Sequence, residues 1–394
     1  MKGQPQTLIS PMNVHVSEAD LADLKQRLAR TRWPDEITNS GWTYGFDSAY
    51  LRDLHDYWLN HFDWRRQEAD WGQLPHFQTE IQGLGIHFVH VRGHGPNPLP
   101  ILITHGWPGS FLEMLKLIPR LADPQQFGGT TENSFDVIVP SLPGFGFSER
   151  PKTPGWNTFK IADAWAELMQ RLGYDKFVAQ GGDFGANIST VLARKYPQHV
   201  VAFHLNYIPG SYLPFVDARE SPMTKEEEAF RVFGERWMEE KGAYSHVQRA
   251  QPQTLAAALH DSPMGLAAWI IDKFRDWADC EGEVENRFTK DDLLANVSLY
   301  WLTETIGSSM RLYLESSRSP LHFARDERLS VPCGVARFPK EEPFPPRCWV
   351  ERVYNVQRWT EMPKGGHFAA WEEPELLADD LREFFRPFRR QRAA

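Results

Sequence analysis

The feature that most constrains this chain is a short apolar run at residues 176–180 that ends in Gly181, Gly182 and Asp183, with a further glycine at position 185. Residues 186–196 then have the composition of a helix. The pattern predicts a strand, a sharp turn and a helix. Glycines on both sides of Asp183 relieve crowding and let its side chain project from the turn, as a nucleophile does at such an elbow. Asp183 is therefore a candidate nucleophile.

A carboxylate at this turn favours a particular chemistry. Serine serves acyl transfer, because its ester can be hydrolysed, whereas attack by serine on saturated carbon would leave a stable ether. An aspartate that attacks saturated carbon forms an ester, which water can clear. Asp183 thus favours displacement at saturated carbon, such as the opening of an epoxide or the removal of a halide. The alternative is that Asp183 only caps the helix that follows it.

Composition excludes several classes of function. The 394 residues carry a net charge of -9 and lack long Lys/Arg-rich runs, which argues against nucleic acid or an anionic membrane as partner. No run approaches 18 apolar residues, and the N-terminus has no signal-peptide core. Three cysteines, Cys280, Cys333 and Cys348, show no metal-ligand spacing. We therefore expect a cytoplasmic protein without a metal or other cofactor.

Strand and helix patterns alternate through the middle of the chain. A hairpin is predicted over residues 77–81 and 86–91, and an N-terminal helical segment over 1–75 precedes it. Strands are then predicted at 101–104, 135–139, 176–180 and 200–205, with helices at 110–121, 160–172 and 186–196. This order predicts an α/β protein with a doubly wound, mostly parallel sheet, and it resembles the α/β-hydrolase fold. The predicted core comprises residues 76–209 and 326–394.

Between the two core segments, residues 210–325 are predicted to form an all-helical insertion. Capping-box patterns begin helices at Thr224 and Thr289, and further helices are expected over 263–277 and 293–315. The insertion is rich in aromatic residues, some of which we expect to form the apolar underside of a lid over an active site. Strand patterns return at 331–336 and 353–359, and a last helix is predicted over 374–385.

The remaining parts of a nucleophilic site have candidates at the expected places. The turn at residues 105–108 directly follows a strand, where the fold supplies one oxyanion-hole amide, from Trp107; the other would come from Phe184. Both residues are also candidates to contact substrate. Pro108 is a candidate for a cis peptide bond. The alternative is that this turn has no functional role.

The base and its orienting acid should lie on loops near the C-terminus. His367 follows the last predicted strand, as the nucleophile-acid-histidine order of the fold requires. The orienting acid should follow the strand before it, where Glu341 and Glu342 are both candidates; a solvated loop would be the alternative explanation for these charges. The alternative position for the acid, after residue 205, holds Asn206 and no carboxylate.

These residues, taken with the rest of the chain, resemble the microsomal-type epoxide hydrolases, in the branch that lacks a membrane anchor. The resemblance covers nearly the whole chain. It rests on the elbow and on motifs at residues 32–34, 62–65, 105–110, 142–148 and 365–375. The resemblance implies an N-terminal segment that wraps round the core and the lid. Within the N-terminal segment, a helix is predicted to begin at Ser17, which is too close to the start of the chain for us to expect an anchor.

The resemblance also implies roles for five residues. Asp183 would be the nucleophile, His367 the base and Glu341 its orienting acid, because the family's Phe-Pro-x-Glu pattern corresponds to residues 338–341. Tyr244 and Tyr313 occupy the positions of the two lid tyrosines that open the epoxide. The partners would be a small-molecule epoxide and water, and the product a vicinal diol. The aromatic lid favours a bulky or aromatic epoxide.

Two alternatives compete with this interpretation. A haloalkane dehalogenase shares the aspartate elbow but must stabilise halide with donors such as an indole N–H, which Trp107 could supply. The paired lid tyrosines favour the epoxide. A non-catalytic α/β-hydrolase-fold protein that binds a ligand would be free to lose its base or acid, whereas this chain has every member in order. Each of these interpretations is compatible with a homo-oligomer.

Overall fold

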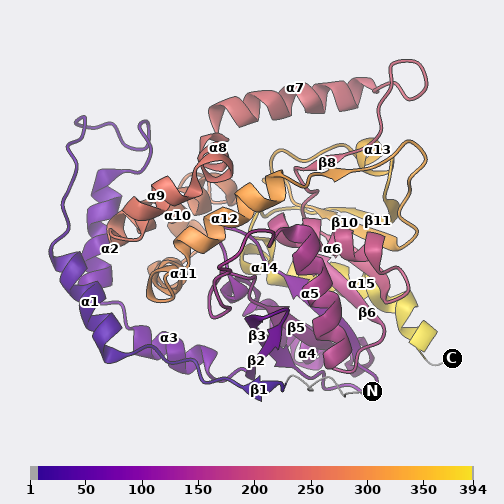
Figure 1. Ribbon diagram of the computed structural model, residues 1–394, viewed down its shortest axis with the longest axis horizontal. Coiled ribbons are helices and arrows are strands. Elements are labelled where there is room, and N and C mark those ends of the chain that lie inside the picture. The colour runs from indigo at the N-terminus through magenta and orange to yellow at the C-terminus, as the bar shows by residue number, and fades with distance from the viewer. Residues whose placement is uncertain (1–7, 393–394) are drawn as a thin grey trace.

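The computed structural model describes residues 8–392, and these form one nine-stranded sheet in the order β1-β2-β3-β5-β4-β6-β7-β10-β11 (Figure 1). The six strands from β5 to β11 in this order are parallel, whereas β1, β2 and β3 form an antiparallel edge. The strands are β1 Ser10–Pro11, β2 His76–Ile81, β3 Leu84–Val91, β4 Leu99–Thr104, β5 Phe135–Pro140, β6 Phe177–Gly181, β7 Val200–Leu205, β10 Pro332–Arg337 and β11 Asn355–Glu361.

Helices cover the central strands. Every residue of β4, β5 and β6 is buried, the pattern of a parallel sheet that is covered on both faces. Helix α5 packs against α6, and α4 packs against α15. These helices are α4 Leu117–Ala122, α5 Thr158–Arg171, α6 Asp183–Lys195 and α15 Pro374–Phe385. The short helix α14 Ala369–Glu372 packs against α15, and a second short helix, α13, spans Arg347–Val350. The predicted α/β-hydrolase fold with a mostly parallel sheet is confirmed.

The register of the central strands brings their carboxyl ends together. Thr104 of β4 pairs with Gly181 of β6, and Gly181 pairs with Leu205 of β7. The loops that follow these three strands therefore leave the sheet side by side. This edge, at the carboxyl ends of parallel strands, is where open α/β sheets bind ligands.

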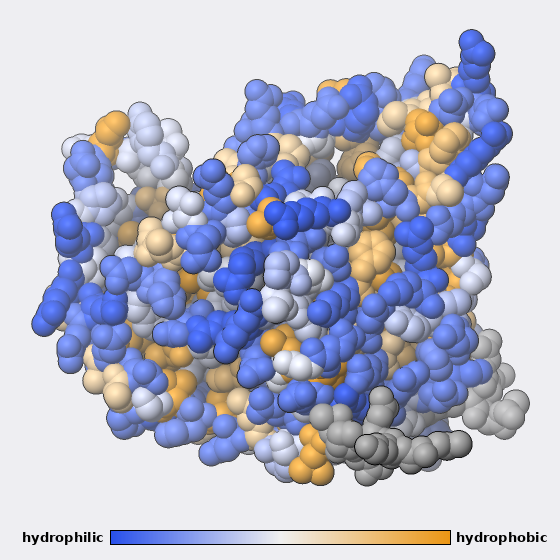
Figure 2. All heavy atoms as spheres, in the orientation of Figure 1, coloured by the Kyte–Doolittle hydropathy of each residue, from blue (hydrophilic) through white to orange (hydrophobic). Residues whose placement is uncertain are grey.

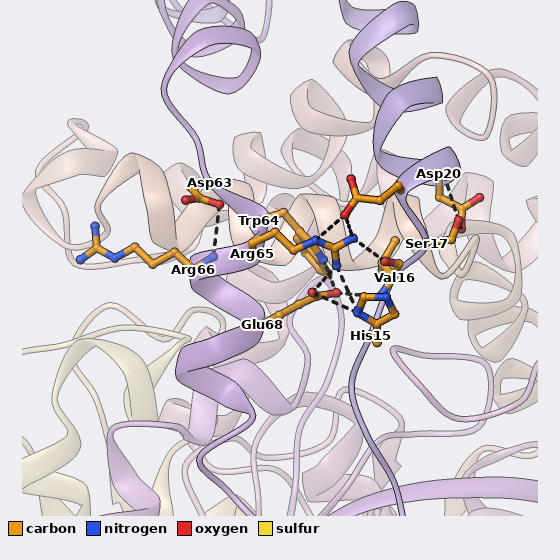
Figure 3. A network of polar contacts seen from close by, with 10 residues as sticks. His15, Val16, Ser17, Asp20, Asp63, Trp64, Arg65, Arg66 and Glu68 are labelled. Carbon is orange, nitrogen blue, oxygen red and sulfur yellow. Dashed lines mark hydrogen bonds and ion pairs between the residues drawn. The ribbon is translucent and has the colours of Figure 1, made fainter.

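Three N-terminal helices, α1 Glu18–Ala29, α2 Ser48–Asn60 and α3 Trp64–Trp71, lie along one side of the molecule (Figure 1). Helices α1 and α2 pack against the later helices α10 and α11. Within the motif at residues 62–65, Arg65 donates to the carbonyl of Val16 at 2.8 Å and pairs with the buried Glu68 (Figure 3). Glu68 in turn accepts from the Val16 N–H at 2.7 Å. These contacts therefore connect α3 to the segment that precedes α1.

Residues between β7 and β10 form six helices that we call the lid, α7 to α12, on top of the sheet edge (Figure 1). The predicted capping boxes at Thr224 and Thr289 are present at the starts of α7 and α11. Helix α7 stands away from the others in the view. The six helices are α7 Lys225–Glu240, α8 Ala243–Ala250, α9 Pro252–Leu259, α10 Pro263–Trp277, α11 Lys290–Leu302 and α12 Ile306–Ser317.

The insertion is not entirely helical, and this corrects the prediction. Strand β8 (Tyr212–Leu213) pairs in parallel with β9 (Leu321–His322), so a short two-stranded sheet joins the two ends of the insertion. Two-residue strands carry too little periodicity to be recognised in sequence. The predicted boundaries of the N-terminal segment, the two core segments and the insertion between them stay predictions.

Two predicted helices are interrupted. The helix expected over residues 293–315 is divided into α11 and α12 at Glu304, whose φ of 55° is left-handed and ends the first helix. The helix expected over 110–121 becomes a 3₁₀ turn, Phe111–Met114, followed by α4. Pro119 lacks the N–H that a continuous helix would need to bond the carbonyl four residues earlier. Within residues 8–392, no helix has both the length and the apolar composition to cross a membrane.

Candidate active site

Asp183 lies at the tight turn between β6 and α6, as the glycine pattern predicts. Its backbone φ of 47° is in the left-handed region, which few residues other than glycine adopt. A Cβ at Gly181 would lie 2.2 Å from the carbonyl of Gly185, and one at Gly185 would lie 1.9 Å from the carbonyl oxygen of Thr104. Both positions therefore require glycine, and the close packing that results fixes the direction of the Asp183 side chain.

Two backbone amides hold one oxygen of the Asp183 carboxylate. The N–H groups of Trp107 and Phe184 donate to Oδ1 at 3.0 and 2.7 Å. Trp107 lies on the loop after β4, and its bond to Pro108 is cis, as expected. Gly106 on the same loop leaves no room for a side chain, because a Cβ would lie 2.2 Å from Oδ1. The structure thus brings the two predicted amide donors to a single oxygen.

The other carboxylate oxygen faces His367. The Nε2 atom of His367 lies 3.6 Å from Asp183 Oδ2, and Nδ1 lies 2.9 Å from Glu341 Oε2. His367 is on the loop between β11 and α14, and its own N–H donates to the carbonyl of Trp277 on the lid at 3.0 Å. Glu341 is buried, whereas Glu342 is exposed. Of the two candidate acids, the structure brings Glu341 to the histidine.

Electrostatics couple these three groups. Burial disfavours the His367 imidazolium, but the carboxylates of Glu341 and Asp183 outweigh burial and raise the pKa of His367 to about 9. Burial raises the pKa of Asp183 and of Glu341, and the positive charge of His367 opposes both shifts. The resting site therefore favours an imidazolium between two carboxylates. Loss of either carboxylate charge lowers the affinity of His367 for its proton.

Tyr244 and Tyr313 reach the same place from two helices of the lid, α8 and α12. Their rings are 6.0 Å apart and nearly perpendicular. Trp107 stacks on Tyr244 at 5.5 Å and meets the edge of Tyr313 at 5.7 Å. Burial is the main cause that raises the pKa of both tyrosines, and the charge of Asp183 raises it further. Both phenols are therefore protonated when Asp183 is ionised.

A cavity of about 1000 Å³, which we call the large cavity, is lined by Asp183, His367 and Glu341 together with both lid tyrosines. Aromatic residues form much of its wall, as the composition of the insertion predicts. Figure 2 shows the molecule from the side seen in Figure 1. Hydrophilic side chains cover most of the surface in that view, and the surface is hollowed beneath α7. A separate groove of about 700 Å³ contains none of the predicted site residues. The aromatic lining of the large cavity includes Phe184, Tyr207, Phe230, Trp237, Trp277 and Trp349.

Sequence analysis missed several residues of this site. Tyr207 lines the large cavity, and its ring lies 6.0 Å from that of His367. It follows β7, and a position just after a parallel strand was the available signal. Glu113 and Gln180 line a small cavity that Asp183 also lines and that neither lid tyrosine lines. Neither had a motif to mark it, because one lies in a predicted helix and the other in a predicted strand.

One observation bears on the halide alternative. The indole N–H of Trp107 is buried and has no hydrogen-bond partner among the described residues. A halide site would need this donor to face the substrate. Trp107 is, however, not among the residues that line the large cavity, whereas both tyrosines are. Both lid tyrosines, and not Trp107, therefore line the cavity that Asp183 also lines.

Comparisons with known proteins show the family of this chain. The model of the family described as epoxide hydrolase N terminus matches residues 9–114, and that of the alpha/beta hydrolase fold matches residues 100–270. Epoxide hydrolase 1 of Oryctolagus cuniculus is 40% identical over 95% of this chain and 88% of its own length. The chain belongs to the epoxide hydrolase family. A Stigmatella aurantiaca relative, named only provisionally as an epoxide hydrolase, is 46% identical over 97% of this chain and 86% of its own.

Solved structures of family members share the whole architecture. Juvenile hormone epoxide hydrolase from the silkworm Bombyx mori is 33% identical, with a TM-score of 0.83 over 98% of this chain and 95% of its own. The epoxide hydrolase of Aspergillus niger is 30% identical, with a TM-score of 0.84 over 97% of both chains. The similarity extends over the N-terminal helices, the sheet and the lid of this family member.

Proposed function

We propose that this family member hydrolyses an epoxide to a vicinal diol through a covalent ester on Asp183. The observation that carries the proposal is the arrangement of the Asp183 carboxylate. Two amides hold Oδ1, Oδ2 faces the histidine, and two lid phenols line the same cavity. A nucleophile, a base and paired acids within one apolar cavity are the parts that this reaction requires.

In the first step, Asp183 Oδ2 attacks an epoxide carbon from the large cavity. The C–O bond of the ring breaks as the new ester bond forms, and a proton from Tyr244 or Tyr313 neutralises the developing alkoxide. Before attack, the two hydroxyls orient the epoxide oxygen and so place the carbon near the carboxylate. The step consumes the negative charge of Asp183 and leaves a tyrosinate.

In the second step, His367 removes a proton from water, whose oxygen attacks Cγ of the ester. The negative charge that develops on Oδ1 is stabilised by the amides of Trp107 and Phe184, which already donate to this atom. The tetrahedral intermediate then releases the diol and restores the Asp183 carboxylate. The proton that His367 carries in the resting site passes to the tyrosinate once the ester has formed, which frees the ring to act as a base. The proton that His367 then takes from water restores the imidazolium, so the net change is the addition of one water to the epoxide.

The large cavity supports a bulky or aromatic epoxide as substrate. Its volume of about 1000 Å³ is at the upper end of the range for sites that bind drug-sized molecules. Trp237 and Trp277 offer flat apolar surfaces on the lid side, which suit an aryl group. A panel of aryl, alkyl and lipid epoxides, with chiral analysis of each diol, tests this part of the proposal. An aryl epoxide is expected to give the highest kcat/KM.

If the reaction passes through an ester on Asp183, ¹⁸O from solvent water should appear in the enzyme before it appears in the diol. Attack of water at Cγ leaves the solvent oxygen on Asp183, so a single turnover with excess enzyme in ¹⁸O-water should give mostly unlabelled diol. Mass spectrometry of the digested enzyme should find the label in the peptide that contains Asp183. Fully labelled diol from the first turnover would mean direct attack by water and would reject the covalent mechanism.

Glu341 and Glu342 provide a matched pair of variants. Glu341→Gln removes the carboxylate that stabilises the imidazolium, so ester hydrolysis should slow by at least about 10-fold, part of the ~10²–10⁴ that general base catalysis supplies. Glu342→Gln, on the adjacent exposed residue, should leave the rate nearly unchanged. Single-turnover kinetics of ester decay measure both. Equal losses in the two variants would reject the assignment of Glu341.

A further inference from the structure

A second, small cavity lies behind the Asp183 carboxylate, and we call it the rear cavity. Its volume is about 10 Å³, about that of one probe sphere and so just enough for a single water molecule. Of the residues that line it, only Asp183 and His367 also line the large cavity. These two side chains therefore form the partition between the space for the substrate and the rear cavity.

The rear cavity contains a buried amide oxygen without a partner. Gln180 is the penultimate residue of β6 and is 1% exposed. Its Nε2 donates to Asn206 Oδ1 at 2.7 Å, whereas its Oε1 has no hydrogen-bond partner among the described residues. An unsatisfied acceptor at such a depth costs free energy unless a water or another donor reaches it. Gln180 thus points to a bound molecule that donates hydrogen bonds.

Glu113 gives the rear cavity a second polar group. It is 8% exposed, on the 3₁₀ turn that follows the Trp107 loop. Its carboxyl packs over the backbone of Gly109, where a Cβ would lie 1.6 Å from Oε1. Burial raises the pKa of Glu113 to about 8, although the positive charge of His367 opposes the shift. At neutral pH the carboxyl is therefore mostly protonated and can both accept and donate a hydrogen bond.

We propose that the rear cavity binds the water that hydrolyses the Asp183 ester, and that Glu113 and Gln180 hold this water against His367. The inference rests on the proposed function of Asp183. Water in this position has a partner for each of its polar groups: Nε2 of His367 takes the proton that is lost, Gln180 Oε1 accepts the hydrogen that is kept, and the protonated carboxyl of Glu113 donates to the water oxygen. A buried water typically makes about three such bonds.

The separation of the two cavities has a mechanistic consequence. The alkyl group of the ester remains in the large cavity, beneath the lid tyrosines, while water attacks Cγ from the opposite side. Water then does not compete with the substrate for space, and a bulky alkyl group does not need to leave before hydrolysis. The O–H bond of the water breaks toward His367, and its oxygen bonds Cγ. The Cγ–Oδ2 bond then breaks, and the departing alkoxide takes the remaining proton of the added water, which releases the diol and restores the carboxylate.

The test separates the two chemical steps in three variants. Glu113→Met and Gln180→Met keep the approximate length of each side chain but remove the groups that bind water. Each should slow ester hydrolysis by up to about 100-fold, the loss that a misplaced reactant causes, and should leave formation of the ester nearly unchanged. Glu113→Gln retains a hydrogen-bond donor, its amide N–H, and should recover most of the lost rate. Stopped-flow burst kinetics with an aryl epoxide measure the steps separately.

Several outcomes would overturn the inference. If folded Glu113→Met and Gln180→Met both hydrolyse the ester at the wild-type rate, the water is not held by these residues. If ester formation slows as much as ester hydrolysis, the residues support the elbow and not the water. Failure of Glu113→Gln to exceed Glu113→Met would also count against it. A wild-type enzyme that makes diol without an ester would instead reject the proposed function, and with it this inference.

Discussion

His367→Gln is expected to arrest the enzyme at the covalent ester. Attack by Asp183 on the epoxide does not require a base, so one equivalent of ester should still form, at a rate lowered only by the higher pKa of Asp183 once the imidazolium charge is lost. Hydrolysis of that ester does require one, and steady-state turnover should fall by about 10⁴-fold, the upper end of what general base catalysis supplies. Intact-protein mass spectrometry should find the enzyme heavier by one substrate.

In the proposed mechanism, the electrostatics of the site allow His367 to act as a base in the second step only. In the free enzyme, the carboxylates of Glu341 and Asp183 hold the pKa of His367 at about 9, so at neutral pH the ring carries a proton and cannot act as a base. Ester formation removes the charge of Asp183, which lowers the pKa of His367 and favours release of that proton. The base is thus generated by the first step.

Asp183→Ala is the matched control for the arrested variant. It lacks the nucleophile, so it should gain no mass on incubation with the same epoxide and should release no diol. Digestion of the His367→Gln adduct should place the added mass on the peptide that contains residue 183. Release of diol by His367→Gln at the wild-type rate, without an adduct, would contradict the role of His367 as base.

The parts of the site that sequence analysis predicted are those whose position the chain itself fixes. The elbow at Asp183 follows from glycines at 181 and 185, whose spacing along one turn leaves few conformations. His367 was found from its order after the last strand. Once the parallel sheet is predicted, the carboxyl ends of its strands must meet at one edge, and Trp107 and Phe184 follow directly from that geometry.

The parts that were missed depend on contacts between distant segments. Glu113 and Gln180 become a pair only because the loop after β4 packs beside β6, and neither residue has a local signature. The break at Glu304 depends on a single left-handed residue within an otherwise helical pattern. The choice between Glu341 and Glu342 depended on a family pattern, because adjacent carboxylates on a loop cannot be distinguished by spacing. Burial, which the structure supplies, distinguishes them.

Replacement of both lid tyrosines is expected to abolish epoxide opening. The conjugate acid of the alkoxide that forms is far weaker than a phenol, whose pKa is about 10 in water, so a phenol can transfer its proton as the C–O bond breaks. Tyr244→Phe and Tyr313→Phe should each slow ester formation by about 10- to 1000-fold, because one hydroxyl partly substitutes for the other. The double variant should lose about 10⁴-fold.

The raised pKa of both phenols suits this role. Burial and the charge of Asp183 keep the protons on Tyr244 and Tyr313 while the carboxylate is ionised. Attack on the epoxide consumes that charge, so the phenols become stronger acids as the alkoxide develops. Proton transfer is thereby coupled to attack. Hydrolysis of the ester, which uses His367 and two backbone amides, should change little, and burst kinetics should find ester formation rate-limiting in each variant.

Tyr300→Phe is the matched control, because it removes a buried hydroxyl that donates to the carbonyl of Gly109 at 2.7 Å but does not line the large cavity. It should cost stability, since a buried acceptor loses its partner, and it should leave ester formation within a few-fold of wild type. If Tyr244 and Tyr313 were only packing residues of the lid, their Phe variants would behave in the same way. The two phenols would be rejected as acids if the folded double variant still opened epoxides. They would also be rejected if the native enzyme released halide faster than it opened epoxides, because halide displacement needs no proton.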